Sequence, residues 1–266
     1  MKNKNYLIIG NPVEHSLSPK IHNFWFKENN INSLYGKETL TENNLESFVK
    51  RIKKGDVDGV NITVPFKQKI IPYLDQLSDL SKKTQSVNTL YKKDNLVVGD
   101  NTDVYGFSQS ILNKKINLKN KSALILGAGG VAPSLITALD SLSIGKIYIK
   151  NRTYEKLLKL KEVFENLEVM DWDQDNDYDI VINATSLGLN VDDKLNFNFN
   201  NLKKKIIFYD TIYNPPMTNL LKNAKEKGHM IINGKSMLLL QAQKSFEIWT
   251  GIKPKIDEDF LSYLDD

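Results

Sequence analysis

The chain has 266 residues, of which 41% are hydrophobic and 26% are charged, and its formal net charge is +4. These proportions are those of ordinary globular proteins, which excludes a disordered chain and favours two modest domains or one large one. The sequence contains no cysteine, which excludes disulfides, thiolate metal sites and cysteine nucleophiles. The surplus of lysine is spread along the chain without interleaved aromatic residues, so we expect no nucleic-acid partner.

No apolar run approaches the roughly 18 residues that cross a bilayer. The first apolar run, Tyr6–Ile9, is too short for the core of a signal peptide. We therefore expect a cytoplasmic protein with no membrane partner. The aspartates between residues 171 and 179 are typical of a solvated loop, and we expect no metal site.

The first hundred residues alternate short apolar runs with amphipathic stretches, which predicts a mostly parallel sheet covered by helices. Tyr6–Ile9 is predicted to form a buried strand. Ser18 is predicted to be the N-cap of a helix that has Pro19 at its first position and ends near Asn29. Thr41 is predicted to cap a second helix.

The same alternation continues toward residue 103. Val57–Val64 is predicted to form the next strand, and Pro65 suits the first turn of a helix that would carry Lys67. Val87–Tyr91 and Leu96–Val98 are predicted to form a hairpin.

The pattern is sharper from residue 122 onward, where strands and helices alternate regularly. The expected strands are 123–126, 147–149, 179–183, 206–209 and 230–232, and the expected helices are 132–140 and 154–164. They predict a doubly wound nucleotide-binding domain over residues 104–236. The last helix, Met237–Trp249, is expected to pack on the first domain, which would then comprise residues 1–103 and 237–266.

A glycine-rich turn follows the first strand of the second domain. Gly127–Ala132 reads Gly-Ala-Gly-Gly-Val-Ala, which matches the dinucleotide fingerprint Gly-x-Gly-x-x-Ala. Gly127 permits the tight turn, Gly129 lets the backbone approach a pyrophosphate, and Ala132 allows close packing of helix on strand. The phosphates would lie at a helix N-terminus, where free N–H groups favour negative charge.

The end of the second strand indicates which dinucleotide is bound. A site specific for NAD has an acid about 20 residues after the glycines. Here the chain reads Asn151-Arg152-Thr153, and a guanidinium can pair with a 2′-phosphate. The interpretation is NADP, and the alternative is that Arg152 and Lys156 only begin an exposed helix.

The first domain places hydroxyl, amide, ammonium and carboxylate groups at strand ends, where open α/β sheets bind ligands. Ser16 and Ser18 lie two apart in a strand-to-helix loop, and Lys67 follows the strand 57–64. Asn88 lies in the first strand of the predicted hairpin, and Asp103 follows its second strand. Such groups could hold a polyhydroxylated carboxylate.

Nine segments carry a resemblance to the shikimate dehydrogenase family, in the same order and at similar spacing over essentially the whole chain. They are Gly10–Pro19, Asn61–Lys67, Val87–Leu90, Gly99–Asp103, Gly127–Ala132, Asn151–Thr153, Ile182–Gly188, Tyr209–Pro215 and Gly234–Ala242. The resemblance implies an α/β protein with a discontinuous substrate domain and a Rossmann-type NADP domain. It also implies NADPH-dependent reduction of 3-dehydroshikimate to shikimate, in the pathway to chorismate and aromatic amino acids, by a monomer or homodimer.

The resemblance also assigns residues to the substrate and the cofactor NADP(H). Lys67 and Asp103 would be the catalytic pair, because an ammonium can stabilise and protonate the oxygen that hydride transfer makes negative. The substrate residues would be Ser16, Ser18, Thr63, Lys67, Asn88, Asp103, Tyr213 and Gln241. The cofactor residues would be Gly127, Ala128, Gly129, Gly130, Val131, Ala132, Asn151, Arg152, Thr153, Lys156, Ala184, Thr185, Ser186, Ile212 and Gly234.

Three alternatives stay open. One is a quinate/shikimate dehydrogenase with relaxed cofactor or substrate use. Lys156 keeps that possible, because relatives often have arginine at its position and lysine lacks the guanidinium fork. The others are a non-catalytic sensor of a pathway metabolite and a two-domain dehydrogenase acting on a folate. His15 and His22 are candidate acid–base residues, but both are expected to have structural roles.

Overall fold

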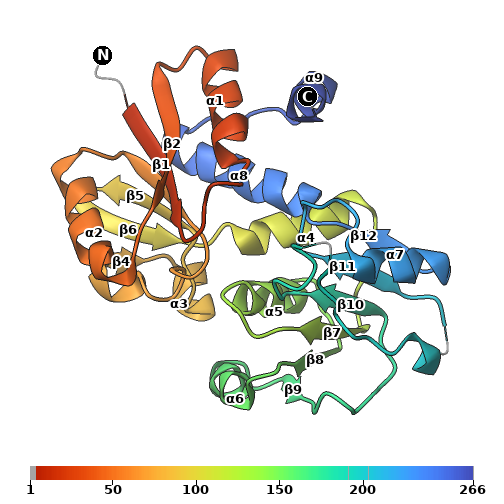
Figure 1. Cartoon of the computed structure of the whole chain (residues 1–266). Coiled ribbons are helices and arrows are strands. Elements are labelled where there is room, and N and C mark those ends of the chain that lie inside the picture. The colour runs from red at the N-terminus through yellow and green to blue at the C-terminus, as the bar shows by residue number, and fades with distance from the viewer. Residues whose placement is uncertain (1–3, 191, 203, 266) are drawn as a thin grey trace. The chain divides into compact units, whose positions relative to one another are not determined.

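The computed structural model describes residues 4–190, 192–202 and 204–265. The chain divides into two compact units. Unit 1 runs to Gly106 and resumes at Leu239, and unit 2 comprises Phe107–Leu238. The chain leaves unit 1 within helix α4 (Asp103–Asn113) and returns within helix α8 (Lys235–Thr250), so unit 1 is built from both ends of the chain (Figure 1).

Unit 1 is a mixed sheet with the strand order β2-β1-β3-β5-β6-β4. The strand β1 runs parallel to β2 and β3, whereas β5 runs antiparallel to both β3 and β6. The strands are β1 (Lys4–Gly10), β2 (Ser33–Thr39), β3 (Gly59–Ile62), β4 (Gln76–Leu77), β5 (Thr89–Lys93) and β6 (Leu96–Asp100). The helices are α1 (Ser18–Glu28), η1 (Glu42–Asn44), α2 (Leu45–Lys54), η2 (Ile71–Tyr73), α3 (Asp79–Thr84) and α9 (Glu258–Asp265), together with the C-terminal part of α8.

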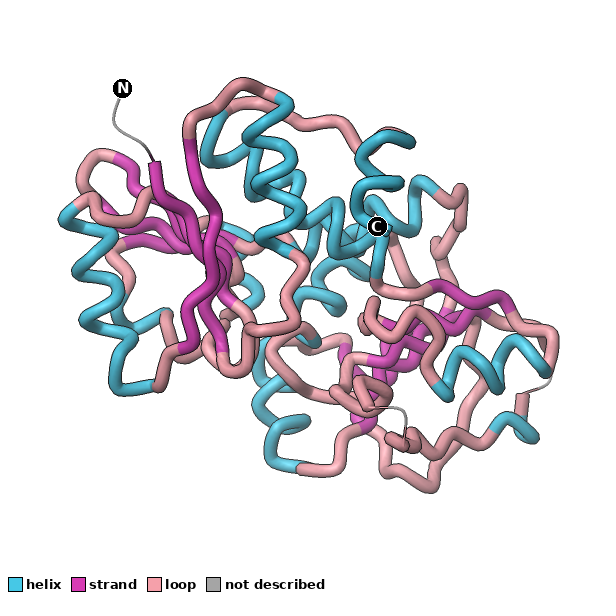
Figure 2. Tube along the Cα trace, turned by 45° about the horizontal axis from the view of Figure 1, so that its top comes forward, coloured by secondary structure: helices cyan, strands magenta, loops and turns pink. Residues whose placement is uncertain are grey.

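The two faces of this sheet follow from the alternation of side chains along β1. Leu7 and Ile9 contact the apolar cluster under α2, whereas Tyr6 lies 5.0 Å from Phe26 of α1 and 5.1 Å from Trp249 of α8, measured between ring centroids. Figure 2 shows the sheet between α2 on one side and α1 on the other.

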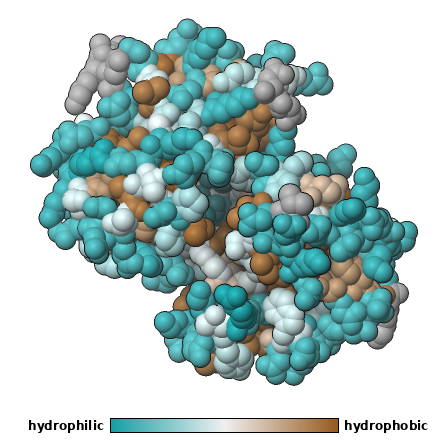
Figure 3. Space-filling view, in the orientation of Figure 1, coloured by the Kyte–Doolittle hydropathy of each residue, from teal (hydrophilic) through white to brown (hydrophobic). Residues whose placement is uncertain are grey.

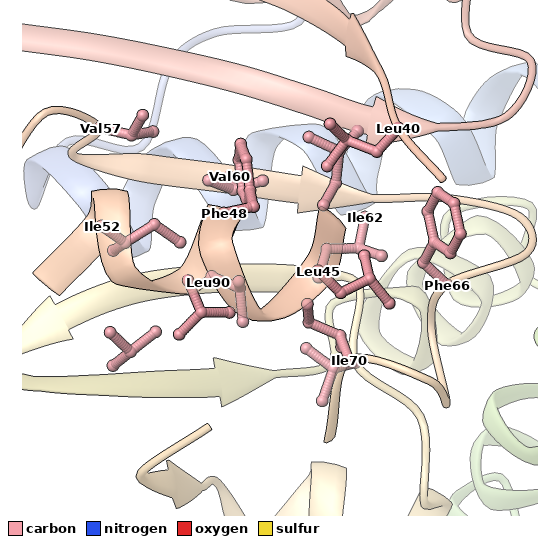
Figure 4. Close-up of a cluster of buried hydrophobic side chains, with 14 residues drawn as sticks. Leu40, Leu45, Phe48, Ile52, Val57, Val60, Ile62, Phe66, Ile70 and Leu90 are labelled. Atoms are coloured by element: carbon pink, nitrogen blue, oxygen red, sulfur yellow. The ribbon is translucent and has the colours of Figure 1, made fainter. Parts of the chain in front are cut away.

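The cluster under α2 is drawn in Figure 4. Leu45, Phe48 and Ile52 follow helical spacing, and they point toward Val60 and Leu90 of the sheet. Each fully buried side chain of this kind contributes about 1.5–3 kcal/mol to folding. Gly55 ends α2 in the left-handed conformation, with φ 79°, which is common for a glycine directly after the last turn of a helix.

Unit 2 is a parallel sheet with the strand order β12-β11-β10-β7-β8-β9. If the six strands of unit 2 are numbered 1 to 6 along the chain, their order across the sheet, starting from β9, is 3-2-1-4-5-6. This is the strand order of dinucleotide-binding domains. The strands are β7 (Ser122–Leu126), β8 (Lys146–Lys150), β9 (Leu167–Val169), β10 (Ile180–Asn183), β11 (Ile207–Asp210) and β12 (Met230–Ile232). The helices are α5 (Ala132–Ser141), α6 (Tyr154–Val163), η3 (Phe199–Asn201) and α7 (Asn219–Glu226). The prediction of a two-domain α/β protein with a Rossmann-type part is confirmed.

Two local predictions are wrong. Ser18 is the first residue of α1 and makes no capping bond, and the N-cap is Leu17. Lys67 lies in a run of turns, not in a helix. Only six residues lie between Pro65 and Pro72, too few to nucleate a helix. The carbonyl of Lys67 instead accepts a hydrogen bond from the backbone N–H of Val87, 2.8 Å away.

Other local predictions are confirmed with small changes. β5 and β6 form the expected hairpin, with a two-residue turn at Asp94 and Asn95, which have positive φ of 49° and 67°. Asn and Asp favour such turns. Thr41 caps the short helix η1 directly before α2.

Hydrophilic side chains cover most of the face drawn in Figure 3, and hydrophobic ones gather there only in small patches. Among the described residues, no helix combines the length and the apolar character that a membrane span requires.

Candidate active site

The polar residues singled out in the first hundred positions converge on one edge of the sheet of unit 1. β1 and β3 are parallel and end together at this edge, with Ile9 opposite Ile62. β5 begins there and β6 ends there, because Thr89 is opposite both Asn61 of β3 and Asp100 of β6. Loops from four strands therefore meet at one edge, as ligand-binding loops do in open α/β sheets.

Lys67 and Asp103 form a close ion pair at this edge. The ammonium nitrogen lies 2.5 Å from Oδ2 of Asp103. The side chains are 12% and 7% exposed, so the pair is largely shielded from water and still reachable by a ligand. Asp103 is the first residue of α4, and a carboxylate is favoured at a helix N-terminus. The pair predicted from sequence is thus brought together by the fold.

Asn88 holds the other carboxylate oxygen of Asp103. Its side-chain amide donates to Oδ1 of Asp103 at 3.0 Å, and to Oε1 of Gln241 on α8 at 3.3 Å. The carbonyl oxygen of the same amide accepts from the backbone N–H of Thr102 at 2.7 Å. One connected group is therefore formed by four of the predicted substrate residues, namely Lys67, Asp103, Asn88 and Gln241.

Ser16 and Ser18 lie in the loop after β1. The backbone N–H of Ser18 donates to the hydroxyl of Ser16 at 3.2 Å, so the Ser16 side chain lies against the backbone of Ser18. Ser18 is buried and Ser16 is half-buried. Burial raises the pKa of Tyr35 well above its ordinary value, and a hydrogen bond between the Ser18 side chain and the Tyr35 hydroxyl opposes that shift.

The loop of Ser16 and Ser18 is fastened to the loop that carries Thr63. Gly10 lies so close to the Thr63 side chain that a Cβ at residue 10 would overlap with its methyl group. The backbone N–H of Asn11 donates to the carbonyl of Val64 at 2.9 Å, and that of Thr63 to Ile9 at 2.9 Å. Unit 1 therefore brings both loops to one place beside Lys67.

The two histidines of this region have different surroundings. His15 is exposed at the loop surface. His22 is buried on α1 among aromatic rings, and burial lowers its pKa to about 3, with the Asn61 side chain opposing the shift. An imidazole with such a pKa is uncharged near neutral pH.

In unit 2, the glycine turn lies where the strand order reverses, between β7 and β10. Gly127 has φ 109°, and a Cβ there would lie 2.7 Å from the Thr185 methyl group, so only glycine fits. The backbone N–H of Ala128 donates to the side chain of Asn151 at 3.0 Å, which ties the turn to the end of β8. Gly129 differs, because the nearest protein atom to a Cβ there is the Ala184 carbonyl oxygen, 3.7 Å away.

This geometry fits a bound dinucleotide. The turn at Gly127–Val131 leads directly into α5, whose N-terminus favours phosphate. Because no side chain stands at Gly129, a pyrophosphate would be able to approach the backbone there. A Cβ at Gly127 would also contact Ala184, so the turn packs against the loop after β10.

Two cations follow β8. Arg152 and Lys156 are exposed, and neither forms an ion pair or hydrogen bond with any residue that the structure describes. Asn151 donates to the carbonyl of Thr153 at 2.8 Å, which shapes the turn that presents Arg152. Cations without a protein partner at this position can serve an anionic ligand.

The remaining predicted cofactor residues lie in loops after β10, β11 and β12. The backbone N–H of Thr185 donates to the Asn183 side chain at 3.0 Å, and that of Ile212 donates to Asp210 at 3.0 Å. Ala184 is buried and Ser186 is exposed. Packing alone requires glycine at position 234, since a Cβ there would overlap with the Thr211 carbonyl oxygen. Tyr213 is in the loop after β11, within unit 2.

The chain is similar to known proteins over its whole length. Residues 8–90 match the family described as shikimate dehydrogenase substrate binding domain, and residues 108–219 match the family shikimate / quinate 5-dehydrogenase. A shikimate dehydrogenase (NADP(+)) of Pelagibacter ubique is 50% identical over 262 residues, which cover 98% of this chain and 99% of that one. The chain belongs to the shikimate dehydrogenase family.

Solved structures of the family are similar in fold. A shikimate dehydrogenase in complex with NADP+ has a TM-score of 0.92 and 35% identity, covering 99% of this chain and 95% of that one. The Thermus thermophilus enzyme, in complex with NADP(H) and shikimate, has a TM-score of 0.88 and 28% identity, covering 98% and 97%.

Sequence reasoning missed several buried polar residues around the family motifs. Asn61 lies within β3, and its amide contacts the hydroxyl groups of Thr89 and Ser245. The Thr102 hydroxyl lies next to that of Ser245. The signal that could have found this group is Asn61, a polar residue within a strand whose residues are all buried. Such a residue requires hydrogen-bond partners.

Proposed function

We propose that the chain catalyses the reversible, NADPH-dependent reduction of 3-dehydroshikimate to shikimate, a step toward chorismate and the aromatic amino acids. Unit 1 holds the substrate and unit 2 holds NADP(H). The observation that carries this proposal is the Lys67–Asp103 pair, 2.5 Å apart and largely shielded at the ligand-binding edge of unit 1. Family membership supports the same reaction.

Lys67 acts on the carbonyl oxygen of 3-dehydroshikimate. Bound NADPH supplies the hydride. The Lys67 ammonium stabilises the negative charge that develops on that oxygen and donates a proton to it. Asp103 keeps the ammonium in position and accepts a hydrogen bond from a ring hydroxyl. Asn88 and Gln241, which contact each other beside the pair, bind the other ring hydroxyls.

Ser16, Ser18 and Thr63 bind the substrate carboxylate, together with Tyr213 of unit 2. The support for this assignment is that the fold holds the two loops of unit 1 together and places the Ser16 side chain against the backbone of Ser18. Hydroxyl groups donate well to carboxylates.

The loops at the strand-order reversal of unit 2 bind NADP(H). Gly127–Ala132 hold the pyrophosphate, and Arg152 with Lys156 pair with the 2′-phosphate, beside Asn151 and Thr153. The exposed position of both cations supports this assignment. Ala184, Thr185, Ser186, Ile212 and Gly234 line the rest of the cofactor site.

The protein works in the cytoplasm, where a biosynthetic reduction draws on the NADPH pool, as a monomer or a homodimer. Its reaction is tested by following NADPH oxidation with 3-dehydroshikimate, in parallel with NADH and with 3-dehydroquinate. We expect turnover with NADPH and 3-dehydroshikimate and much less in the other pairings. An absence of turnover with NADPH and 3-dehydroshikimate would refute the proposal, and equal turnover with 3-dehydroquinate would favour the broader quinate/shikimate activity.

A further inference from the structure

A cluster of buried hydroxyl groups lies behind the Lys67–Asp103 pair in unit 1. Ser245 of α8 is at its centre, with its hydroxyl oxygen 2.8 Å from that of Thr89 and 3.1 Å from that of Thr102. All three residues are at most 1% exposed, so water does not compete for these bonds. The cluster connects α8 to the strand β5 and to the loop before α4.

The orientation of the cluster is set from its far side by Tyr35. The Tyr35 hydroxyl donates to the carbonyl oxygen of the Asn61 amide at 2.7 Å. The nitrogen of that amide must therefore face the other way, where it lies 3.0 Å from the Ser245 hydroxyl and 3.2 Å from that of Thr89. The same nitrogen also lies 3.1 Å from the backbone carbonyl oxygen of Asn88, so its two hydrogens serve three acceptors. In the arrangement in which Ser245 donates to the Thr89 oxygen, the hydroxyl hydrogen of Thr89 is available for another acceptor.

That acceptor is the side-chain carbonyl oxygen of Asn88, 3.1 Å from the Thr89 hydroxyl. The same oxygen accepts from the backbone N–H of Thr102 at 2.7 Å. The Thr102 hydroxyl, 3.2 Å away, is a third donor to this oxygen. These donors hold the oxygen on the side of the cluster, and the NH2 group of Asn88 faces Asp103 at 3.0 Å. A flipped amide would place its oxygen against the Asp103 carboxylate and its NH2 group against the N–H of Thr102, which are two repulsive contacts.

We propose that Thr89 and Ser245 are positioning residues of the reaction, which act through Asn88. They hold the Asn88 amide in the one orientation that donates to Asp103, and Asp103 in turn holds the Lys67 ammonium. This inference rests on the function proposed above, because it assumes that the Lys67–Asp103 pair acts on substrate. In the structure, Thr89 contacts the Asn88 side chain directly, whereas Ser245 contacts Thr89 and Thr102. Both residues are buried.

The first test removes the Thr89 hydroxyl without changing the shape of the side chain. Thr89→Val is expected to lower kcat for 3-dehydroshikimate about 10-fold, the scale of one lost hydrogen bond in a charged network, and to leave the KM for NADPH unchanged. Thr89→Ser, which keeps the hydroxyl, is expected to restore kcat. Ser245→Ala is expected to change kcat in the same direction as Thr89→Val, by a smaller factor.

Thr137→Val is a matched control, since Thr137 of α5 is also buried and its hydroxyl has no hydrogen-bond partner among the described residues. It is expected to leave kcat unchanged. Thermal unfolding of each variant shows whether a loss of kcat reflects loss of folded protein. An unchanged kcat in folded Thr89→Val, or a loss that Thr89→Ser does not restore, would overturn the proposal.

The second test observes the Asn88 amide directly in the protein without substrate or cofactor. In ¹⁵N spectra, with the signal assigned from an Asn88→Asp variant, the NH2 protons of Asn88 are expected to exchange slowly with water in the wild type and in Thr89→Ser. They are expected to exchange faster in Thr89→Val. Unchanged exchange in Thr89→Val would overturn the positioning role. If the wild type does not reduce 3-dehydroshikimate, the proposed function fails, and this measurement still decides whether the cluster orients Asn88.

Discussion

The His22 ring stacks on the Tyr35 ring, with 4.4 Å between the centroids and 9° between the planes. Burial in this aromatic surrounding lowers the pKa of His22 from its ordinary 6.5 to about 3. The unfolded chain therefore binds a proton below pH 6.5 that the folded chain does not bind until near pH 3. The stability that His22 contributes to the folded state is therefore fully present above pH 6.5. It is lost as the pH falls from 6.5 toward 3.

The contribution of His22 should be visible in the pH dependence of unfolding. Between pH 7 and pH 5, the wild type should lose about 2 kcal/mol of its free energy of unfolding through His22 alone. His22→Phe, which keeps an aromatic ring and cannot be protonated, should lose that much less, as measured by urea unfolding at each pH. His15→Gln, a change at an exposed histidine, should leave the wild-type dependence intact. Parallel curves for His22→Phe and the wild type would show that His22 is not the titrating group.

Removing the ammonium at the centre of the site should affect the chemical step more than binding. Lys67→Ala is expected to lower kcat at least about 10²-fold, the scale for a positioned acid–base group, with a smaller change in KM. Lys69→Ala is the control, because Lys69 is exposed and pairs only with Glu42 among the described carboxylates. A higher KM with nearly unchanged kcat in Lys67→Ala would make Lys67 a binding residue only.

Cofactor choice should depend on Arg152. Arg152→Ala is expected to weaken NADPH binding by about 1.5–3 kcal/mol, the scale of charge-assisted hydrogen bonds, and to leave NADH binding nearly unchanged. Fluorescence titration with each cofactor measures both. Lys159→Ala, at an exposed lysine on the same helix α6, controls for a general loss of positive charge. Equal losses for the two cofactors would contradict a contact with the 2′-phosphate.

Recognition of the carboxylate should depend on the two neighbouring serines. The double variant Ser16→Ala, Ser18→Ala is expected to raise the KM for 3-dehydroshikimate strongly, with a smaller change in kcat and no change in NADPH binding. A substrate analogue without the carboxylate should lose little further on the variant. Ser47→Ala, at an exposed serine of α2, should behave as the wild type. If the wild type and the double variant discriminate equally between acid and analogue, the carboxylate is bound elsewhere.

Two glycines should respond differently to the same substitution. Gly234→Ala places a Cβ against the Thr211 carbonyl oxygen, so we expect it to lower the free energy of unfolding by about 1–3 kcal/mol. Gly129→Ala meets no protein atom closer than 3.7 Å, so it should leave stability unchanged and weaken NADPH binding. Thermal unfolding and a cofactor titration separate the two effects. Normal NADPH affinity in Gly129→Ala would contradict close approach of the pyrophosphate to this turn.

The sequence predicted the alternating strands and helices well where both faces of a strand are buried. The strand β10 is buried throughout, and its apolar run is unmistakable. The strand β2 escaped prediction because it lies at the edge of its sheet, with Leu34 exposed and Gly36 in its centre, so its residues show no clear alternation.

The sequence predicted which residues form the site, but it did not predict which of them contact one another. Lys67 and Asp103 are 36 positions apart, and their contact arises from the pairing of β3, β5 and β6. The Ser245 contacts depend on where α8 packs, which composition and periodicity do not specify. A helix at Lys67 was expected from Pro65 alone, and the competing hydrogen bond from Val87 comes from a segment twenty residues away.

The return of the chain to unit 1 at Leu239 has a consequence for synthesis on the ribosome. The aromatic face of β1 and α1 is covered by Phe246 and Trp249, which are translated after the whole of unit 2. Unit 2 is continuous and can fold as soon as Leu238 has emerged. The N-terminal segment, although made first, must wait with Tyr6 and Phe26 uncovered until α8 is complete. Nascent chains stalled before Leu239 therefore expose an apolar surface that a chaperone would bind.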